Sequence, residues 1–360
     1  MICVTEHTHR QHGRLTRFVI GAALVVLLVG TPRVRADELM VGEKTHRRVQ
    51  IVSYEKGVVD FRKPNGTFDS VPVWDVDFFL IDSATGLADF NQAEEYLLKG
   101  QPAQAVERYE RALRIAPEFW PEIAWARLLM AADRAGDTEQ AIRAMVHVAA
   151  NDAVIAAHLL PENLPPARNR DGERILGALD RAARESAGSD AGILVELVRY
   201  KTLAGMRDAR AQELVERVAL SPLPEALVTS RTMSIRLAGL DALIEQGGGK
   251  QVIEAINRTL PGVPREFLFD LLLLKSKALL ASAGSQQDYY EAALPAMRVA
   301  IHGDDDQQVA EGLLLAARAH EQAGLTQDAA RLLRECLRKE NAAQATLDEA
   351  RTALTRLRES

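Results

Sequence analysis

Aromatic residues and cysteines are scarce in this chain. Phe, Trp and Tyr together make up only 5% of the 360 residues, and the two cysteines are Cys3 and Cys336. Few aromatic residues among many Ala and Leu favour close-packed helices over a large sheet. Because Cys3 lies in an N-terminal segment that we expect to be removed, Cys336 is left alone, and no intrachain disulfide is expected.

Sequence motifs for catalysis and metal binding are missing as well. There is no Gly-x-Ser-x-Gly motif, and GGGK at 247–250 lacks the upstream Gly and the following Ser or Thr of a phosphate-binding loop. The histidines after residue 36 show neither i, i+4 spacing nor a His-Glu-x-x-His pattern. The acidic run at 304–306 lacks the alternating ligands of a calcium loop, so we expect one of its aspartates to cap a helix beginning near Gln307. The sequence therefore predicts no catalytic residue, no cofactor and no metal site.

The first 36 residues are typical of a secretory signal peptide. Three arginines precede an apolar run over 18–30, and Val34 and Ala36 are the small residues expected before a cleavage site. This run is shorter than the roughly 20 residues that span a bilayer. We predict cleavage after Ala36 and export, with the bacterial periplasm as the expected location. Secretion and retention of the segment as an anchor are the alternatives.

The charge of the remaining chain is negative. Residues 37–360 hold 39 basic and 49 acidic residues, which gives a formal charge of −10. An acidic chain has no electrostatic reason to bind nucleic acid or an anionic lipid surface. We therefore expect no nucleic-acid partner and no stable membrane insertion after cleavage.

Residues 37–85 have the features of a small β module. β-branched and aromatic residues gather in short runs at 49–54, 58–63 and 68–73, separated by turns at Lys56-Gly57 and Asn65-Gly66, and 74–81 can add a fourth strand. Val59 and Phe61 alternate with Asp60 and Arg62, as expected for a sheet with one wet face. This three- to four-strand pattern resembles SH3-like and LSm-like modules. Because so few residues bury little surface alone, we expect the module to dock on the following helices or to dimerise.

The chain then changes to a helical repeat pattern. In YLLKGQPAQAVERYERALRIAP, at 96–117, small residues, a Gly turn, aromatic residues and a closing Pro follow one another in a fixed order. Ala93, Ala105 and Ala112 allow two helices to approach closely, and Gly100 begins the turn between them. This order resembles the tetratricopeptide repeat, a helix-turn-helix unit of about 34 residues.

The Gly-x4-Ala spacing of Gly100 and Ala105 recurs along the chain. Gly136 and Ala141 repeat it 36 residues later, Gly324 and Ala329 repeat it near the C-terminus, and a looser copy lies around 293–300. The resemblance implies a mainly α protein, a solenoid of antiparallel helix pairs. The predicted organisation is a signal peptide (1–36), a β module (37–85), repeats (86–160), degenerate helical repeats or a separate helical domain (161–264), repeats (265–343) and a capping helix (344–360).

One apolar segment within the second repeat block needs a separate interpretation. FLFDLLLLKSKALLASAG, at 267–284, is apolar on nearly every side, but Asp270, Lys275 and Lys277 interrupt it. We interpret it as a buried inner helix rather than a membrane span.

Solenoids of this family bind partners in a concave groove lined by the first helix of each repeat. The resemblance places groove positions at Leu87, Phe90, Glu94, Leu97, Met130, Asp133, Arg134, Leu314, Arg318 and Glu321. It therefore implies a non-catalytic scaffold of the bacterial cell envelope that binds a protein or peptide partner. Two alternatives stay open. One is an accessory subunit or an enzyme with an unfamiliar site near His147 and His158. The other is a structural subunit that self-assembles through the β module or the helical array, with a homo-oligomer through the β module as the specific expectation.

Overall fold

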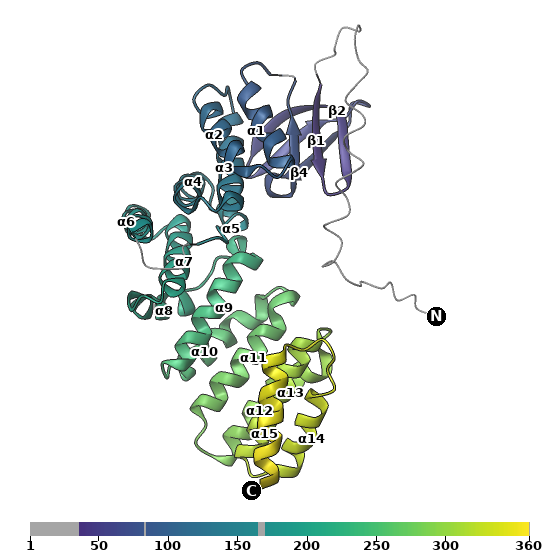
Figure 1. The fold of residues 1–360 in the computed structure, drawn as a ribbon, viewed down its shortest axis with the longest axis vertical. Coiled ribbons are helices and arrows are strands. Elements are labelled where there is room, and N and C mark those ends of the chain that lie inside the picture. The colour runs from purple at the N-terminus through teal and green to yellow at the C-terminus, as the bar shows by residue number, and fades with distance from the viewer. Residues whose placement is uncertain (1–35, 83, 165–169, 360) are drawn as a thin grey trace.

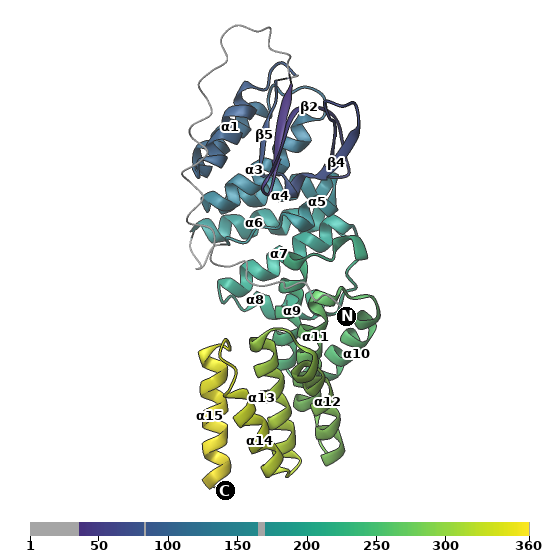
Figure 2. The ribbon, with the colours of Figure 1, turned by 90° about the vertical axis from the view of Figure 1, so that its right-hand side faces the viewer.

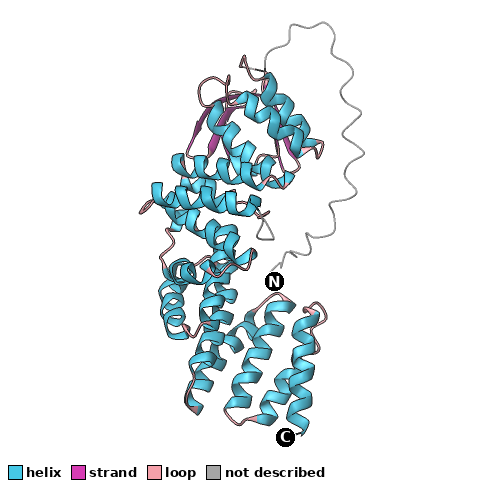
Figure 3. Cartoon of the chain, turned by 60° about the vertical axis from the view of Figure 1, so that its left-hand side comes forward, coloured by secondary structure: helices cyan, strands magenta, loops and turns pink. Residues whose placement is uncertain are grey.

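The computed structural model describes residues 36–82, 84–164 and 170–359. The predicted signal peptide, except for Ala36, lies outside the described residues. Figure 1 shows an elongated molecule with a small sheet at one end and the C-terminal helices at the other. The strands are confined to the first end, and helices make up the rest (Figure 3).

The sheet has five antiparallel strands rather than the predicted three or four. They are β1 (Asp37–Val41), β2 (Lys44–Glu55), β3 (Val58–Arg62), β4 (Phe68–Pro72) and β5 (Phe78–Leu80), in the order β4-β3-β2-β1-β5. The sequence analysis missed β1 because these five residues follow directly after the predicted cleavage site and carry two acids. One of the two, Asp37, is buried, and its carboxylate accepts hydrogen bonds from the backbone N–H groups of Ile51 (2.9 Å) and Asp82 (3.0 Å).

The strand pattern puts one face of the sheet against the helices. In β3, Val59 and Phe61 are buried while Asp60 and Arg62 face outward, as the alternation predicted. Gly57 follows the strand end with a φ of +76°, and a Cβ there would lie 2.7 Å from the side chain of Ile155. This close approach brings the sheet onto the helical part of the chain, so the predicted docking of the β module is confirmed.

The described residues then form fifteen α-helices, and short loops join most of them. They are α1 (Ala88–Leu98), α2 (Pro102–Ala112), α3 (Trp120–Ala135), α4 (Thr138–Asn151), α5 (Ala153–His158), α6 (Arg170–Glu185), α7 (Asp190–Gly205), α8 (Arg210–Leu220), α9 (Ser230–Glu245), α10 (Gly249–Thr259), α11 (Arg265–Ser282), α12 (Gln286–His302), α13 (Asp306–Gln322), α14 (Thr326–Cys336) and α15 (Gln344–Glu359). The 3-10 helices η2 (Val73–Asp75), η3 (Glu225–Leu227) and η4 (Leu260–Gly262) lie in connecting segments. The predicted fold class, a mainly α array preceded by a small β module, is confirmed.

In the repeats, small residues lie where two helices pack, and glycines lie at the turns between helices. Ala93, Ala105 and Ala112 are fully buried where α1 and α2 pack together. Gly100 and Gly324 each follow the first helix of a pair with φ values of +70° and +82°, which a residue with a side chain rarely adopts. The predicted helix-turn-helix units are therefore present, and membership of the tetratricopeptide family stays a prediction.

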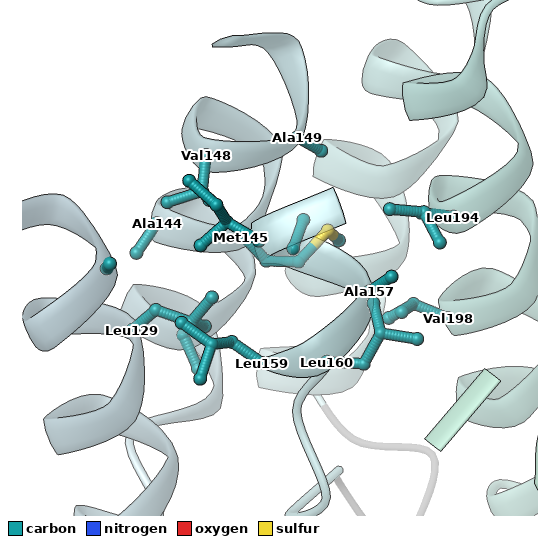
Figure 4. Close-up of a cluster of buried hydrophobic side chains, with 14 of the residues drawn as sticks. Leu129, Ala144, Met145, Val148, Ala149, Ala157, Leu159, Leu160, Leu194 and Val198 are labelled. Atoms are coloured by element: carbon teal, nitrogen blue, oxygen red, sulfur yellow. The ribbon is translucent and has the colours of Figure 1, made fainter. Parts of the chain in front are cut away.

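The middle of the chain continues the same stack. Helix α7 contacts α5 and α9, and α9 contacts α11, while α8 and α10 pack against their neighbours on the other side. Figure 4 shows the start of this region, where Leu129 of α3 lies beside Leu159, and Leu160 lies on the side of Val198 of α7, within one buried cluster. The helix axes turn along the array: α4, α6 and α7 lie across the long axis of the molecule, and α13–α15 lie along it (Figure 2).

The apolar segment at 267–284 forms most of α11, as predicted for an inner helix. It packs among α9, α10, α12 and α13. In the described part of the chain, no helix combines the length and the apolar character required to cross a bilayer. The acidic run that follows α12 caps the next helix, because the Asp305 carboxylate accepts a hydrogen bond from the Gln307 N–H at 2.7 Å.

Candidate functional site

A buried ion pair joins the sheet to the first repeats. Glu94 of α1 and Arg127 of α3 are both fully buried, and the guanidinium donates to both carboxylate oxygens at 2.7 Å. Arg127 also donates to the carbonyls of Val76 (2.6 Å) and Asp77 (3.0 Å) beside β5. Burial alone would lower the pKa of Arg127, but Glu94 outweighs it, so the pKa is raised and the charge is retained.

Each carboxylate oxygen of Glu94 accepts a further hydrogen bond. Glu94 accepts hydrogen bonds from the backbone N–H of Phe79 (3.0 Å) and from the hydroxyl of Tyr109. Burial, with Glu94 next, raises the pKa of Tyr109 well above its ordinary value of 10, so the phenol remains a donor. Glu94 is therefore a structural residue that ties α1, α2, α3 and the sheet together.

The predicted groove residues of α1 are consequently wrong as partner-binding residues. Phe90 is fully buried and packs edge to face against Phe79 of β5 (6.1 Å between ring centroids) and Tyr109 (5.7 Å). Leu87 and Leu97 are buried as well. The physical reason is that the chain's own sheet occupies the face of α1 that a partner would need.

The predicted positions on α3 divide into two kinds. Asp133 is buried, and its Oδ1 accepts the backbone N–H groups of Glu162 (3.0 Å) and Asn163 (2.9 Å), which fixes the loop after α5. The assignment of Asp133 to a partner surface is therefore wrong. Met130 is half-buried and Arg134 is exposed, so these two side chains keep an accessible surface.

The predicted positions of the last repeat are covered by the C-terminal helix. Leu314 is buried in a cluster that includes residues of α14 and α15. Arg318 forms an ion pair with Glu349, and Glu321 accepts two hydrogen bonds from Arg356 at 2.7 and 3.0 Å. Leu314 is therefore wrong as a partner-binding residue, whereas Arg318 and Glu321 form ion pairs with α15, and the Arg318 side chain stays 40% exposed.

The recessed surface of the array lies in its middle instead. A first pocket of about 680 Å³ lies among α6, α7 and α8, and a second of about 540 Å³ lies among α8, α9, α10 and η4. Pro222 and Leu223, in the loop after α8, line both pockets, as does Arg236 of α9. We call residues 221–223 the central ridge, because this loop separates the two pockets.

The charged residues of the first pocket are mostly paired with one another. Arg199 lies 2.6 Å from Asp180 and 3.4 Å from Glu196, and Arg217 lies 3.3 Å from the same glutamate. Arg236 is different. It is only 6% exposed, yet no acidic side chain of the described residues pairs with it.

Arg236 has weak partners in place of a carboxylate. Its Nε donates to the carbonyl of Ala219 and its Nη2 to the hydroxyl of Thr259, each at 3.4 Å. Burial lowers the pKa of Arg236, and the charge of Arg258 lowers it further. The shared wall of the two pockets therefore carries a positive charge that the described chain does not neutralise.

The sequence analysis did not select Arg236, although the sequence contains a signal for it. Helix α9 buries Met233, Leu240 and Leu243, and Arg236 falls on the same face at helical spacing. A charged residue on the core face of an amphipathic helix is unusual and marks a site to examine.

The histidines that an enzymatic site would need lie against separate tryptophans. His147 stacks on Trp125 at 4.2 Å between ring centroids, and His158 stacks on Trp74 at 4.0 Å. Burial lowers the pKa of both imidazoles. Neither lines the two pockets, and the described residues contain no group of three or more metal-ligating side chains.

No protein-family model matches the sequence, and no curated protein is similar enough in sequence to count as a relative. The functional argument therefore depends on the geometry of the chain itself.

Proposed function

We propose that this protein is a non-catalytic scaffold of the bacterial cell envelope that binds a segment of a partner protein. The proposal combines the predicted export signal with a stacked helical array, an architecture suited to protein recognition. The observation that carries it is the pair of adjoining pockets on either side of the central ridge.

The binding surface we propose differs from the one expected at the ends of the array. The sheet covers α1 and the C-terminal helix covers α13, whereas the pockets between α6 and η4 have no covering element among the described residues. The second pocket combines apolar side chains with three charged ones, and the first combines them with seven charged ones of both signs, a mixture suited to protein recognition.

Site-specific photocrosslinking in cells tests this function. Photoreactive residues at Ala187 and Glu225, exposed at the first and second pocket, are compared with one at Met130 on α3. We expect one envelope protein to be captured at both pocket positions, and its purified form to bind the scaffold in solution. Failure of purified candidates to bind would contradict the proposal.

Self-assembly is a second candidate function, supported by one specific feature. Helix α12 exposes Leu294 (68%) and Ile301 (67%) two turns apart on its outer face. Light scattering coupled to size-exclusion chromatography tests it. A dimer that Leu294→Glu converts to a monomer would support self-assembly, and a wild-type monomer at micromolar concentration would contradict it.

A further inference from the structure

The guanidinium of Arg236 is a buried donor group with unused capacity. A guanidinium carries five N–H donors, and Arg236 uses them for two long hydrogen bonds, both to uncharged oxygens. Burying a cation without a counter-charge is costly, and a carboxylate is the group that best matches the fork of an arginine. The geometry therefore favours an anionic ligand group at this position.

The neighbouring charges limit that ligand to a small negative charge. On the first-pocket side, Asp180, Asp190 and Glu196 line the cavity, and Asp180 and Glu196 are already paired with Arg199. None of the three forms an ion pair with Arg236, and together they would repel a multiply charged anion. On the second-pocket side, Arg258 adds a positive charge, and Glu225 is the one acid among the lining residues. A ligand with a single carboxylate fits both conditions, because it pairs with Arg236 and Arg258 and carries too little charge for the acids of the first pocket to repel it strongly.

The shape around Arg236 points to an extended chain rather than a compact molecule. Pocket walls with Ile193 and Leu197 lie on one side of the central ridge, and walls with Val228 and Val263 lie on the other. In an extended peptide, alternate side chains point to the same side at about 6–7 Å spacing. An acidic residue can therefore occupy the central position while apolar residues on either side enter the two pockets.

We propose that Arg236 binds the side-chain carboxylate of an Asp or Glu in an extended partner segment that lies across the central ridge. The flanking apolar side chains of that segment fill the two pockets, and Arg258 supports the carboxylate from the second. This inference rests on the proposed scaffold function and specifies its ligand.

Selection from a peptide library tests the proposal. Random twelve-residue segments are displayed with both ends blocked by the carrier protein, so that side chains alone supply carboxylates, and are selected on the full chain. We expect the enriched sequences to share one acidic residue between apolar residues. For a selected peptide, Arg236→Gln should weaken binding at least tenfold, and replacing the peptide's Glu by Gln should weaken it equally.

The two changes combined should cost no more than either alone, since both remove the same contact. Arg298→Gln on α12, outside both pockets, is the matched control and should leave binding unchanged. If Arg236→Gln impairs folding, Arg258→Gln examines the same site, with an expected two- to fivefold loss. Equal binding by Arg236→Gln and wild type, or enrichment of sequences without an acid, would overturn the inference. If selected peptides without an acid still bind the chain tightly, only the inference about Arg236 is contradicted. Failure of the crosslinking experiment would contradict the proposed scaffold function itself.

Discussion

Two buried arginines distinguish the region around the sheet from the middle of the array. Arg127 is fully buried and meets a bidentate carboxylate and two backbone carbonyls at 2.6–3.0 Å. Arg236 is 6% exposed and meets one carbonyl and one hydroxyl, both at 3.4 Å. Arg127 thus has its counter-charge within the fold, whereas no acidic side chain of the described residues pairs with Arg236.

This difference separates a structural role from a recognition role. A buried charge with a full set of short hydrogen bonds holds elements together, and its loss leaves partners unsatisfied. A buried charge with few and long bonds costs free energy without a matching gain. Because Arg236 also lines two pockets, we propose that it recognises an anionic group.

The largest expected effect is at the junction of sheet and helices. Arg127→Met should lower the free energy of unfolding by about 3–5 kcal/mol, because Glu94 and two carbonyls lose their partner in a buried setting. Urea unfolding followed by circular dichroism measures it. The double change of Arg127→Met with Glu94→Leu should cost less than the sum of the two single changes, because both remove the same ion pair. A loss below about 1 kcal/mol for the single variant would mean that the pair does not hold this junction.

The hydroxyl of Tyr109 should have the next largest effect. Tyr109→Phe removes a hydrogen bond to a buried carboxylate, which is worth about 1.5–3 kcal/mol. Urea unfolding at neutral pH provides the measurement, with Tyr289→Phe on α12 as a control that makes no such bond in the described structure.

The same tyrosine gives a pH dependence of defined direction. Because its pKa is raised in the native state, the unfolded chain loses the proton first, and the stabilising contribution is fully present below the ordinary value of 10. It is lost as the pH rises above 10. The stability difference between wild type and Tyr109→Phe should therefore shrink on alkaline titration, and a difference that grows would contradict this assignment.

A smaller effect is expected where the C-terminal helix is attached. Arg356 is 62% exposed at its side chain and pairs with Glu321, so Arg356→Ala should lower the free energy of unfolding only slightly, and by still less at high salt. Arg358→Ala on the same helix is the control. Urea unfolding at low and high salt tests this, and a loss of several kcal/mol would show that the pair contributes far more than an exposed ion pair does.

The smallest stability effect is expected at Arg236. Arg236→Met should leave the free energy of unfolding within about 1 kcal/mol of wild type, since an apolar side chain of similar length avoids the cost of an unpaired charge. Measured beside Arg127→Met, this variant tests the contrast directly. Equal and large losses in both would make Arg236 a structural residue like Arg127.

Much of the fold could be predicted from the sequence because it depends on local patterns. The Gly-x4-Ala steps at Gly100, Gly136 and Gly324 marked three helix turns, and the alternation in β3 assigned its buried face. The first strand was missed because its pairing with β2 and β5 is a long-range property that its five residues do not encode.

The candidate site could be predicted much less well. Family resemblance assigned Phe90 and Glu94 to an open groove, but the sequence of a helix does not reveal which other element packs on its face. The sheet covers that face, while the pockets around Arg236 form where α6, α8 and α10 leave space beside α7 and α9. The position of Arg236 between the two pockets depends on how the consecutive helices α6 to α10 pack, which no single helix encodes.

The sequence by itself determined the helix pairs, their turns and the small packing residues, because propensity, left-handed glycines and helical periodicity act within a few residues. Only the tertiary structure decided which surfaces remain free and which charges remain unpaired. Burial and ion pairing depend on which elements meet in space, as where Arg127 reaches Glu94 and Val76, and a local sequence pattern does not encode such meetings.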